Sequence, residues 1–458
     1  MKNNSITFCT GVGTVTGANF LLETVSGSKI LIDCGLVQGE KVANDENREA
    51  FHYDLSTISA LVITHAHLDH VGRIPILVRE GYAGPIYSTP ETRSLAELVL
   101  TDAVHILATE AERDGLEPLY NRTDVDRAFV NWKTVPYHQN FEITKDISVF
   151  LKDAGHILGS AMIEVSVTSQ EKIEKILFTG DLGNSPAPLL RDTEPVGDVD
   201  YMVMESVYGD RNHESRDERT DKLEQVIKKT ISRGGTLVIP TFAIDRTQVL
   251  LYELNNLSEQ KKIPPVSVFV DSPMATAATE IYKGSMDLFN DNAKKQIANG
   301  DRLFDFPHLQ FTTSQAQSSE IEKDSKAKII LAGSGMSMGG RVISHEEYYL
   351  PDPKSTILLV GYQMAGSLGR RLMDGEKSVR IQDRKVKVQA QIETILGFSA
   401  HKDGDHLVGL VATATPRLKK VFVVMGEPKA SMHLAQRINN ELSTQAMMPE
   451  RLKTYELE

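Results

Sequence analysis

The chain has 458 residues, 41% of them apolar, and carries 50 Lys+Arg against 62 Asp+Glu, a formal charge of −12. This length suffices for roughly two to four domains, and the composition excludes disorder of the whole chain. The net acidity argues against binding nucleic acid through bulk charge.

The two cysteines exclude a disulfide framework and are typical of a reducing compartment. The N-terminal ten residues lack the long apolar core of a signal peptide, and no apolar stretch approaches the ~20 residues that cross a bilayer. We therefore expect a cytoplasmic protein with no membrane partner.

The first elements in chain order are short β-type runs at Ser5–Thr10, Asn19–Thr24 and Lys29–Asp33, separated by glycines. This spacing predicts a meander of antiparallel strands. A buried strand at Ala60–Thr64 and a helical stretch over Glu91–Asn131 follow. The next expected strands are Ile147–Leu151, Ala161–Thr168 and Lys175–Thr179.

From about residue 205 the pattern changes, because apolar runs without polar alternation now alternate with helical stretches. This pattern predicts a parallel α/β sheet covered on both faces. The expected strands are Thr236–Pro240, Val266–Val270, Lys328–Leu331 and Thr356–Val360.

After about residue 385 strands return at Lys385–Ala390 and Lys420–Met425, followed by a helix over His433–Leu442. The sequence thus predicts one α/β domain, 208–384, inserted into another that consists of 1–207 and 385–458. Charge follows the same division: residues 1–204 hold 16 basic and 29 acidic side chains, residues 205–384 hold 24 and 25, and residues 385–458 hold 10 and 8.

The strongest chemical signal directly follows the Ala60–Thr64 strand, where His65, His67, Asp69 and His70 lie within six residues. Imidazole and carboxylate are ligands that zinc prefers. A surface loop that is His-rich by chance is the alternative, and four candidate ligands at this density make it improbable.

Three further candidates stand at strand ends: Asp33 in L-I-D-C-G-L, His156 in D-A-G-H-I-L-G-S and Asp181 in F-T-G-D-L-G-N. Each alone is more often a turn or cap residue. Together with the cluster they form a series in which a bridging carboxylate could hold two metals ~3.5–4 Å apart.

These motifs resemble the metallo-β-lactamase fold, an αββα sandwich. Six ordered motifs in the later chain resemble its β-CASP branch, which contains the RNA-cleaving subunit of the eukaryotic 3′-end processing machinery (the cleavage and polyadenylation specificity factor) and prokaryotic relatives. They are M-E-S-V-Y-G-D-R, P-T-F-A-I-D-R-T-Q, D-S-P-M-A, S-G-M-S-M-G-G-R, G-Y-Q and G-F-S-A-H. The resemblance implies that 208–384 is an inserted β-CASP domain.

The resemblance also implies roles for single residues. His65, His67 and His156 would hold one zinc ion, Asp69 and His70 a second, and Asp181 would bridge the two. Asp69 would also orient the attacking water, and Asp33 would steady a ligand from behind. His401 would donate a proton to the leaving oxygen, with Glu205 fixing its orientation.

The loops of the inserted domain suit a phosphate chain. Arg246 could fork onto a phosphate. Ser334, Gly335 and Met336 could offer backbone N–H groups at the start of the next helix, and Gly366 to Arg370 could do likewise. An ordinary strand-to-helix turn is the alternative for each loop alone, and four such loops on one sheet favour a substrate cleft.

One position departs from the family pattern. Met425 in V-V-M-G-E stands where RNA-processing members carry a histidine that completes the second zinc site. A thioether is a poor zinc ligand among oxygens and imidazoles, so we expect weaker binding of the second zinc. The branch that acts on DNA in repair also has an apolar residue here.

We therefore expect a zinc-dependent nuclease that cleaves single-stranded RNA and leaves a 5′-phosphate. A DNA-directed nuclease and a catalytically weak nucleic-acid-binding subunit are the alternatives. A small-molecule hydrolase is disfavoured, because such enzymes lack the inserted domain. The terminal strand and helix could form a homodimer face.

Overall fold

The computed structural model describes residues 3–38, 41–169, 172–364 and 366–458, which form two compact units. The first unit comprises Met1–Ser185, Asp192–Asn212 and His401–Glu458, and the second comprises Pro186–Arg191 and His213–Ala400. The chain therefore leaves the first unit, folds the second and returns, which is the connectivity of an inserted domain.

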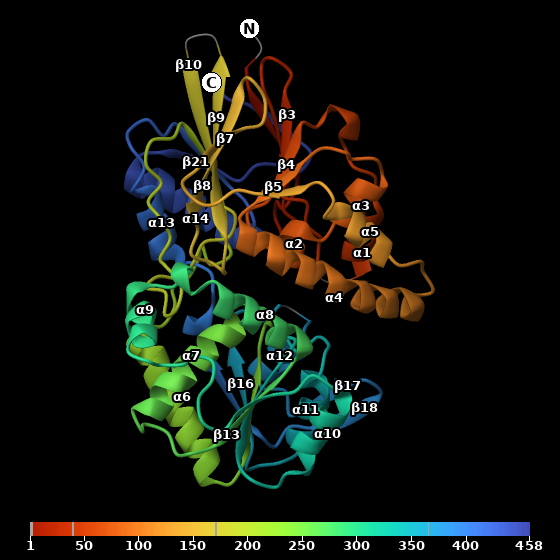
Figure 1. The fold of residues 1–458 in the computed structure, drawn as a ribbon, viewed down its shortest axis with the longest axis vertical. Coiled ribbons are helices and arrows are strands. Elements are labelled where there is room, and N and C mark those ends of the chain that lie inside the picture. Colours follow the sequence, from red (N-terminus) through yellow and green to blue (C-terminus); the bar gives the residue numbers. More distant parts are fainter. Residues whose placement is uncertain (1–2, 39–40, 170–171, 365) are drawn as a thin grey trace. The chain divides into compact units, whose positions relative to one another are not determined.

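Two seven-stranded sheets form the centre of the first unit (Figure 1). One sheet has the order β22 (Thr454–Glu456), β1 (Ser5–Thr10), β2 (Asn19–Glu23), β3 (Lys29–Ile32), β4 (Ala60–Val62), β5 (Ile86–Ser88), β6 (Trp132–Thr134). The other has the order β21 (Gln445–Met447), β20 (Lys420–Val423), β11 (Tyr201–Met204), β10 (Lys172–Phe178), β9 (Ala161–Ser169), β8 (Ile147–Asp153), β7 (Asn140–Glu142). Strands β1, β2 and β3 pair antiparallel, which confirms the predicted meander.

Apolar side chains from both sheets meet in one core. Phe8 and Leu22 of the first sheet and Val165 and Phe178 of the second belong to the same buried cluster. Burial of this much apolar surface is the main force that holds the two sheets face to face. The C-terminal strands join each sheet, so the first unit is built from both ends of the chain.

Helices cover the outer faces, which gives the expected αββα sandwich. Helices α13 (Gly404–Val411) and α14 (Pro428–Leu442) pack Leu407 and Leu434 against the outer face of the second sheet. The remaining helices of this unit are α1 (Lys41–Arg48), α2 (Leu68–Val71), α3 (Ile74–Arg79), α4 (Pro90–Asp114) and α5 (Arg122–Ala128).

The helical stretch expected over 91–131 is in fact two helices. Helix α4 ends at Gly115, whose φ of 68° is the left-handed conformation that closes many helices. Helix α5 begins after Asn121, whose side chain forms a capping box with Asp124. Local capping chemistry therefore overrides the helical composition between them.

The sheet of the second unit is parallel, as predicted, but it has six strands where four were expected. Its order is β14 (Leu309–Phe311), β13 (Ser267–Asp271), β15 (Lys328–Ala332), β12 (Thr236–Pro240), β16 (Thr356–Val360), β19 (Gln391–Ile395). A hairpin of β17 (Ser378–Ile381) and β18 (Arg384–Lys387) precedes β19. The first half of the strand expected at 385–390 therefore falls on β18, and the second half lies between β18 and β19.

Helices lie on both faces of this sheet, with α6 and α7 on one side and α10 and α11 on the other (Figure 1). The helices of the unit are α6 (Arg216–Ser232), α7 (Arg246–Glu259), α8 (Pro273–Gly284), α9 (Asp291–Ala298), α10 (Gln315–Lys323), α11 (Val342–Tyr349) and α12 (Leu368–Met373). Because all six strands run parallel, the loops that follow them share one edge of the sheet.

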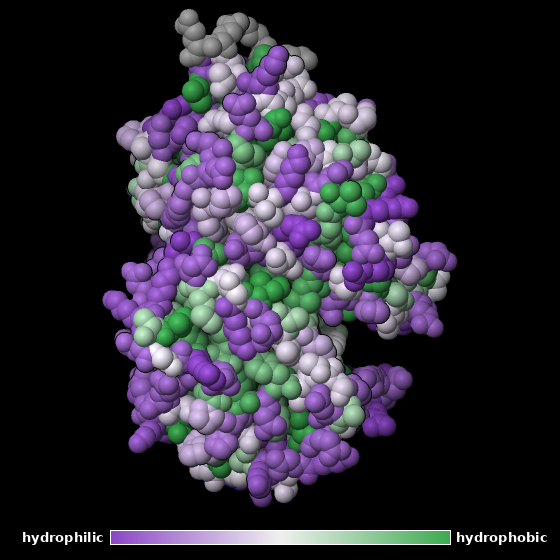
Figure 2. Space-filling model, in the orientation of Figure 1, coloured by the Kyte–Doolittle hydropathy of each residue, from purple (hydrophilic) through white to green (hydrophobic). Residues whose placement is uncertain are grey.

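The visible face of the molecule is mostly hydrophilic, with smaller hydrophobic areas between (Figure 2). Within the ranges that the structure describes, no helix has both the length and the apolar character needed to cross a membrane.

Candidate metal centre

The His-rich segment lies where β4 gives way to α2 in the first unit. Strand β4 ends at Val62 and α2 begins at Leu68, so His65 and His67 lie on the connecting loop and Asp69 and His70 on the helix. His156 follows β8, and Asp181 follows β10. Three strand ends therefore bring these residues together.

Three imidazole nitrogens converge at one point. Nδ1 of His67 lies 3.1 Å from Nε2 of His65 and 3.2 Å from Nε2 of His156. Oδ2 of Asp181 lies 3.5 Å and 3.7 Å from the same two Nε2 atoms. The four residues offer ligand atoms within 4.8 Å of one another, which is close enough for one cation.

A second group of ligand atoms shares Asp181. Nε2 of His70 lies 3.3 Å from Oδ1 of Asp181 and 3.8 Å from Oδ2 of Asp69. Both Nε2 of His70 and Oδ1 of Asp181 are buried and have no hydrogen-bond partner. An unpaired buried acceptor is costly. A second cation between these atoms would satisfy both, so the residues present fit a two-metal site.

Asp33 lies directly behind His70. Its Oδ2 accepts from Nδ1 of His70 at 2.7 Å, while Thr64 donates to Oδ1 from its backbone N–H and to Oδ2 from its hydroxyl, both at 2.8 Å. The bond from Nδ1 leaves the lone pair of Nε2 available to a cation. Thr64 is a supporting residue that the sequence reasoning missed, and its place at the end of a strand next to the cluster was the available signal.

Glycine 35 allows this close packing. A Cβ atom at Gly35 would lie 1.6 Å from the backbone oxygen of Asp69. The N–H of the neighbouring Cys34 donates to the carbonyl of His70 at 2.8 Å. Backbone contact thus fixes the helix that carries Asp69 and His70 against the end of β3.

The groups of the site shift one another's pKa values in both directions. Burial opposes the charged form of His70, but Asp181 and Asp33 hold the pKa of His70 well above its ordinary value. Burial, reinforced by the nearby His70, holds the pKa of His65 well below its ordinary value, so its imidazole is neutral. Burial raises the pKa of Asp69 to about 6. Burial opposes the charged form of Asp181 as well, but His70 and His65 hold the pKa of Asp181 well below its ordinary value.

Glu205 and His401 form a pair beside the ligand cluster. Nδ1 of His401 lies 3.1 Å from Oε1 of Glu205 and 3.9 Å from Oδ2 of Asp181. The backbone N–H groups of Leu182 and Val207 donate to Glu205 at 2.7 and 3.2 Å. Burial alone would lower the pKa of His401, but Glu205 and then Asp181 raise it to about 9. The imidazole is therefore protonated near neutral pH.

Met425 lies close to these groups without offering a hard ligand atom. It lines the same small cavity as Asp33, His70 and Glu205. The Met425 side chain belongs to the apolar core between the sheets, and its sulfur packs against Gly11, where a Cβ atom would come within 2.9 Å.

The candidate phosphate-binding residues all lie in the second unit. Arg246 is the first residue of α7 and is buried, with Nη1 donating to the Val360 carbonyl at 3.4 Å. Arg370 pairs with Asp374 on α12, at 3.0 Å. Gly366 is exposed on the loop before that helix.

The segment Ser334–Met336 does not lie at the start of a helix, because α11 begins only at Val342. The N–H of Ser334 donates to the Gly339 carbonyl at 3.1 Å, so the segment is part of a loop over 333–341 that is closed by a hydrogen bond within itself. The intervening glycines allow this loop to fold back on itself before the helix begins.

A buried carboxyl group holds the 333–341 loop. Oε1 of Glu346 accepts from the Ser337 hydroxyl at 2.6 Å, and burial raises the pKa of Glu346 from its ordinary value of 4.5 to about 8. At a pH between these two pKa values, Glu346 is protonated in the folded protein and ionised in the unfolded chain. The stability that the protonated Glu346 contributes is therefore fully present below about pH 4.5 and is lost as pH rises through about 8.

We expect Glu346→Gln to flatten this pH dependence, because the amide cannot ionise but its oxygen still accepts from Ser337. Urea unfolding at about pH 5 and about pH 8.5 should show a wild-type loss of up to a few kcal/mol, at ~1.4 kcal/mol per pKa unit. The variant should lose less than the wild type. Equal losses in the two proteins would contradict the assignment.

Three family models match the chain. A metallo-β-lactamase superfamily domain matches residues 21–191, a β-CASP domain matches 247–372, and a Zn-dependent metallo-hydrolase RNA specificity domain matches 385–449. The first contains all six candidate metal ligands. The third contains His401 and Met425.

Two curated relatives align over nearly the whole chain. A ribonuclease of Thermus thermophilus is 33% identical over 92% of this chain and 93% of its own length. A transcription termination factor of Methanosarcina mazei is 32% identical over 96% of this chain and 69% of its own. A crystal structure of an Enterococcus faecalis protein of unknown function covers 99% of this chain and 100% of its own, with a TM-score of 0.57 and 14% identity, and so shares the fold.

Proposed function

The chain belongs to the β-CASP family of the metallo-β-lactamase superfamily, and on that premise we propose that it is a zinc-dependent nuclease that hydrolyses phosphodiester bonds of single-stranded RNA. The observation that carries the proposal is the position of Asp181, whose carboxylate is shared by the two groups of ligands described above and by a third group that adds Glu205 and His401. Most of these side chains are buried. The match to an RNA specificity domain and the similarity to a ribonuclease support RNA as the substrate.

The ligand roles follow from the two groups. His65, His67 and His156 would hold one zinc ion, Asp69 and His70 the other, and Asp181 would contact both. Zinc bound there would supply Lewis acidity for activating a water and for offsetting charge on the phosphate. Asp33 keeps His70 in the tautomer that ligation requires.

The proton that the leaving oxygen needs would come from His401. Glu205 is anchored by two backbone N–H groups, so it can hold the His401 ring in a fixed orientation. Asp69 lies at the edge of the ligand cluster and is less buried than His70, which suits its expected second role of orienting the attacking water.

One side-by-side digestion tests this function. End-labelled single-stranded RNA and DNA of equal sequence are incubated with the zinc-loaded protein, with and without a chelator. RNA cleavage that stops on chelation is expected. Cleavage of DNA with RNA spared would assign the DNA-directed alternative, and binding of RNA without cleavage would assign the non-catalytic one.

Met425 motivates a prediction about the second zinc. We expect Met425→His to raise affinity for that ion, by roughly the 10- to 100-fold that single residues around a metal site contribute, because an imidazole replaces a thioether beside His70. Zinc titration against a chelator measures the change. Met432→His, at an exposed site on α14, is the control. Unchanged stoichiometry and chelator sensitivity in Met425→His would count against this position as a ligand site.

The remaining expectations are proposals too. We propose that the inserted domain begins after residue 207 and ends at residue 384. The boundaries between the two compact units lie somewhat later in the chain, after residues 212 and 400. A cytoplasmic location is supported by two buried free cysteines. A homodimer through the terminal strand and helix is tested by measuring the mass in solution with light scattering.

A further inference from the structure

One aromatic side chain of the second unit is exposed where the parallel strands end. Phe242 lies on the loop between β12 and α7 and exposes 40% of its surface. The other phenylalanines of the described residues are buried or partly buried. This loop is at the carboxyl edge of the sheet, where α/β proteins usually bind ligands.

The ring of Phe242 lies on the backbone of the neighbouring loop. A Cβ atom at Gly335 would come within 2.5 Å of Cδ2 and 2.7 Å of Cε2 of Phe242. Only a glycine therefore lets the ring lie this close. The loop supports the ring on one side, and the exposed part of the ring faces solvent.

Hydrogen bonds hold both partners of this contact. The Phe242 carbonyl accepts from the Thr247 hydroxyl at 2.8 Å. The Gly335 carbonyl accepts from the buried Gln363 side chain at 3.0 Å. Because these hydrogen bonds already order the loops, little conformational entropy is lost when a ligand binds to the open face of the Phe242 ring.

A second exposed apolar side chain stands on the Gly335 loop. Met338 exposes 54% of its surface, and its N–H donates to the Ser334 hydroxyl at 3.0 Å. Strands β12 and β15, which these two loops follow, are direct neighbours with Pro240 opposite Ala332. A thioether and an aromatic ring are both polarisable surfaces that suit a flat ligand.

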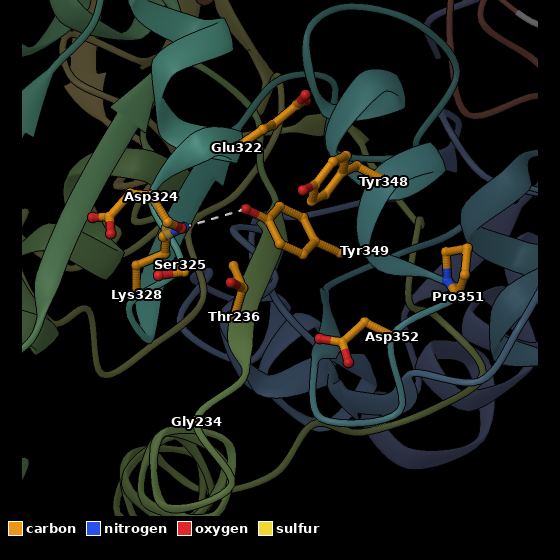
Figure 3. Close-up of a pocket in the computed structure, with 10 residues that line it drawn as sticks. All are labelled: Gly234, Thr236, Glu322, Asp324, Ser325, Lys328, Tyr348, Tyr349, Pro351 and Asp352. Atoms are coloured by element: carbon orange, nitrogen blue, oxygen red, sulfur yellow. Dashed lines mark hydrogen bonds between the residues drawn. The ribbon is translucent and has the colours of Figure 1, made fainter.

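Charge distinguishes the two edges of this sheet. The opposite edge carries a pocket of about 410 Å³ whose lining includes Glu322, Asp324 and Asp352, which would repel phosphate (Figure 3). At the carboxyl edge, Asp271 forms an ion pair with Arg341 at 2.6 Å and a hydrogen bond with His345 at 2.7 Å. The carboxyl edge is thus the one that can accept a polyanion.

We propose that Phe242 is a stacking platform for one nucleobase of the single-stranded RNA. The proposal rests on the proposed function and adds a base subsite to it. Every base has a π-face, so the subsite would tolerate any sequence, and stacking on an aromatic ring contributes to binding at each occupied position.

The test removes the ring and the base in turn. KM and kcat are measured for wild type and Phe242→Leu on a single-stranded oligoribonucleotide and on a set that carries one abasic nucleotide at each position. In the wild type we expect one abasic position to raise KM by about tenfold. In Phe242→Leu the KM for intact RNA should rise by about the same factor, and that abasic position should cost nothing further.

Two variants serve as controls. Phe242→Tyr keeps the ring and should keep the abasic penalty. Tyr348→Leu removes an exposed aromatic side chain at the acidic edge and should leave all KM values unchanged. Unfolding midpoints by urea separate a local effect from misfolding.

The outcomes are distinguishable. If the wild type cleaves RNA and the abasic penalty persists in Phe242→Leu, the platform is refuted while the proposed function stands. If the wild type cleaves no RNA under any metal condition, the proposed function itself fails. Unchanged RNA kinetics together with a changed mass in solution would assign the ring to a protein interface and also refute the platform.

Discussion

Asp181→Asn is expected to lower zinc content to one ion or fewer per chain and to reduce RNA cleavage by about a thousandfold or more. The side chain is buried, and its two oxygens lie 3.3 Å from Nε2 of His70 and 3.5 Å from Nε2 of His65. An amide has nearly the same volume but no charge. A zinc-activated nucleophile supplies several kcal/mol, and 1.4 kcal/mol is a factor of ten in rate.

Elemental analysis after dialysis and single-turnover cleavage measure the two effects. Asp200→Asn is a matched control, because Asp200 is a buried carboxylate of the same unit that pairs with Arg417 at 2.7 Å, away from the ligands. It should keep full zinc content. Two tightly held ions and normal cleavage in Asp181→Asn would show that this carboxylate does not link the two sites.

Sequence periodicity was sufficient for most of the longer strands, but it was insufficient for short strands such as β5 and β14 and for helix ends. The parallel sheet of the second unit could be predicted because buried parallel strands read as continuous apolar runs. The break between α4 and α5 could not, because it depends on the left-handed Gly115 and on an Asn121 cap rather than on composition. Capping competes with propensity at single positions, where a pattern carries little signal.

The candidate ligands fall into those that are neighbours in the sequence and those that only the fold brings together. His65, His67, Asp69 and His70 are adjacent in sequence, so their clustering required no fold. His156 and Asp181 are brought in by the ends of β8 and β10. Their strand-end positions made them candidates, and the resemblance to a known family gave each of them a ligand role. Thr64 acts through Asp33 and has no motif of its own.

The excess negative charge also has a partly local origin. Residues 1–204 carry 16 basic and 29 acidic side chains, a net charge of −13. Asp33, Asp69 and Asp181 are among these acids and lie in the candidate site, where bound zinc would offset their charge. Total charge was therefore a poor guide to the partner, because it includes carboxylates that the proposed cofactor neutralises.

His401→Ala is expected to reduce RNA cleavage by about 10²- to 10⁴-fold while zinc content stays unchanged. When water attacks phosphorus and leaves a 5′-phosphate, the bond to the 3′-oxygen breaks, and that oxygen must gain a proton. The partly exposed His401, paired with the buried Glu205, is placed to donate this proton, with 3.1 Å between Nδ1 and Oε1.

A substrate with sulfur in place of the 3′-oxygen separates proton donation from other roles, because a thiolate leaves without being protonated. We expect His401→Ala to cleave this substrate at nearly the wild-type rate, and Glu205→Gln to show a smaller loss on normal RNA that the sulfur also relieves. His138→Ala removes another His–carboxylate pair, with Glu194 at 2.7 Å, and should be neutral. An equal loss on both substrates in His401→Ala would mean that the ring positions the substrate or a ligand, because only a proton donor becomes dispensable when the leaving group needs no proton.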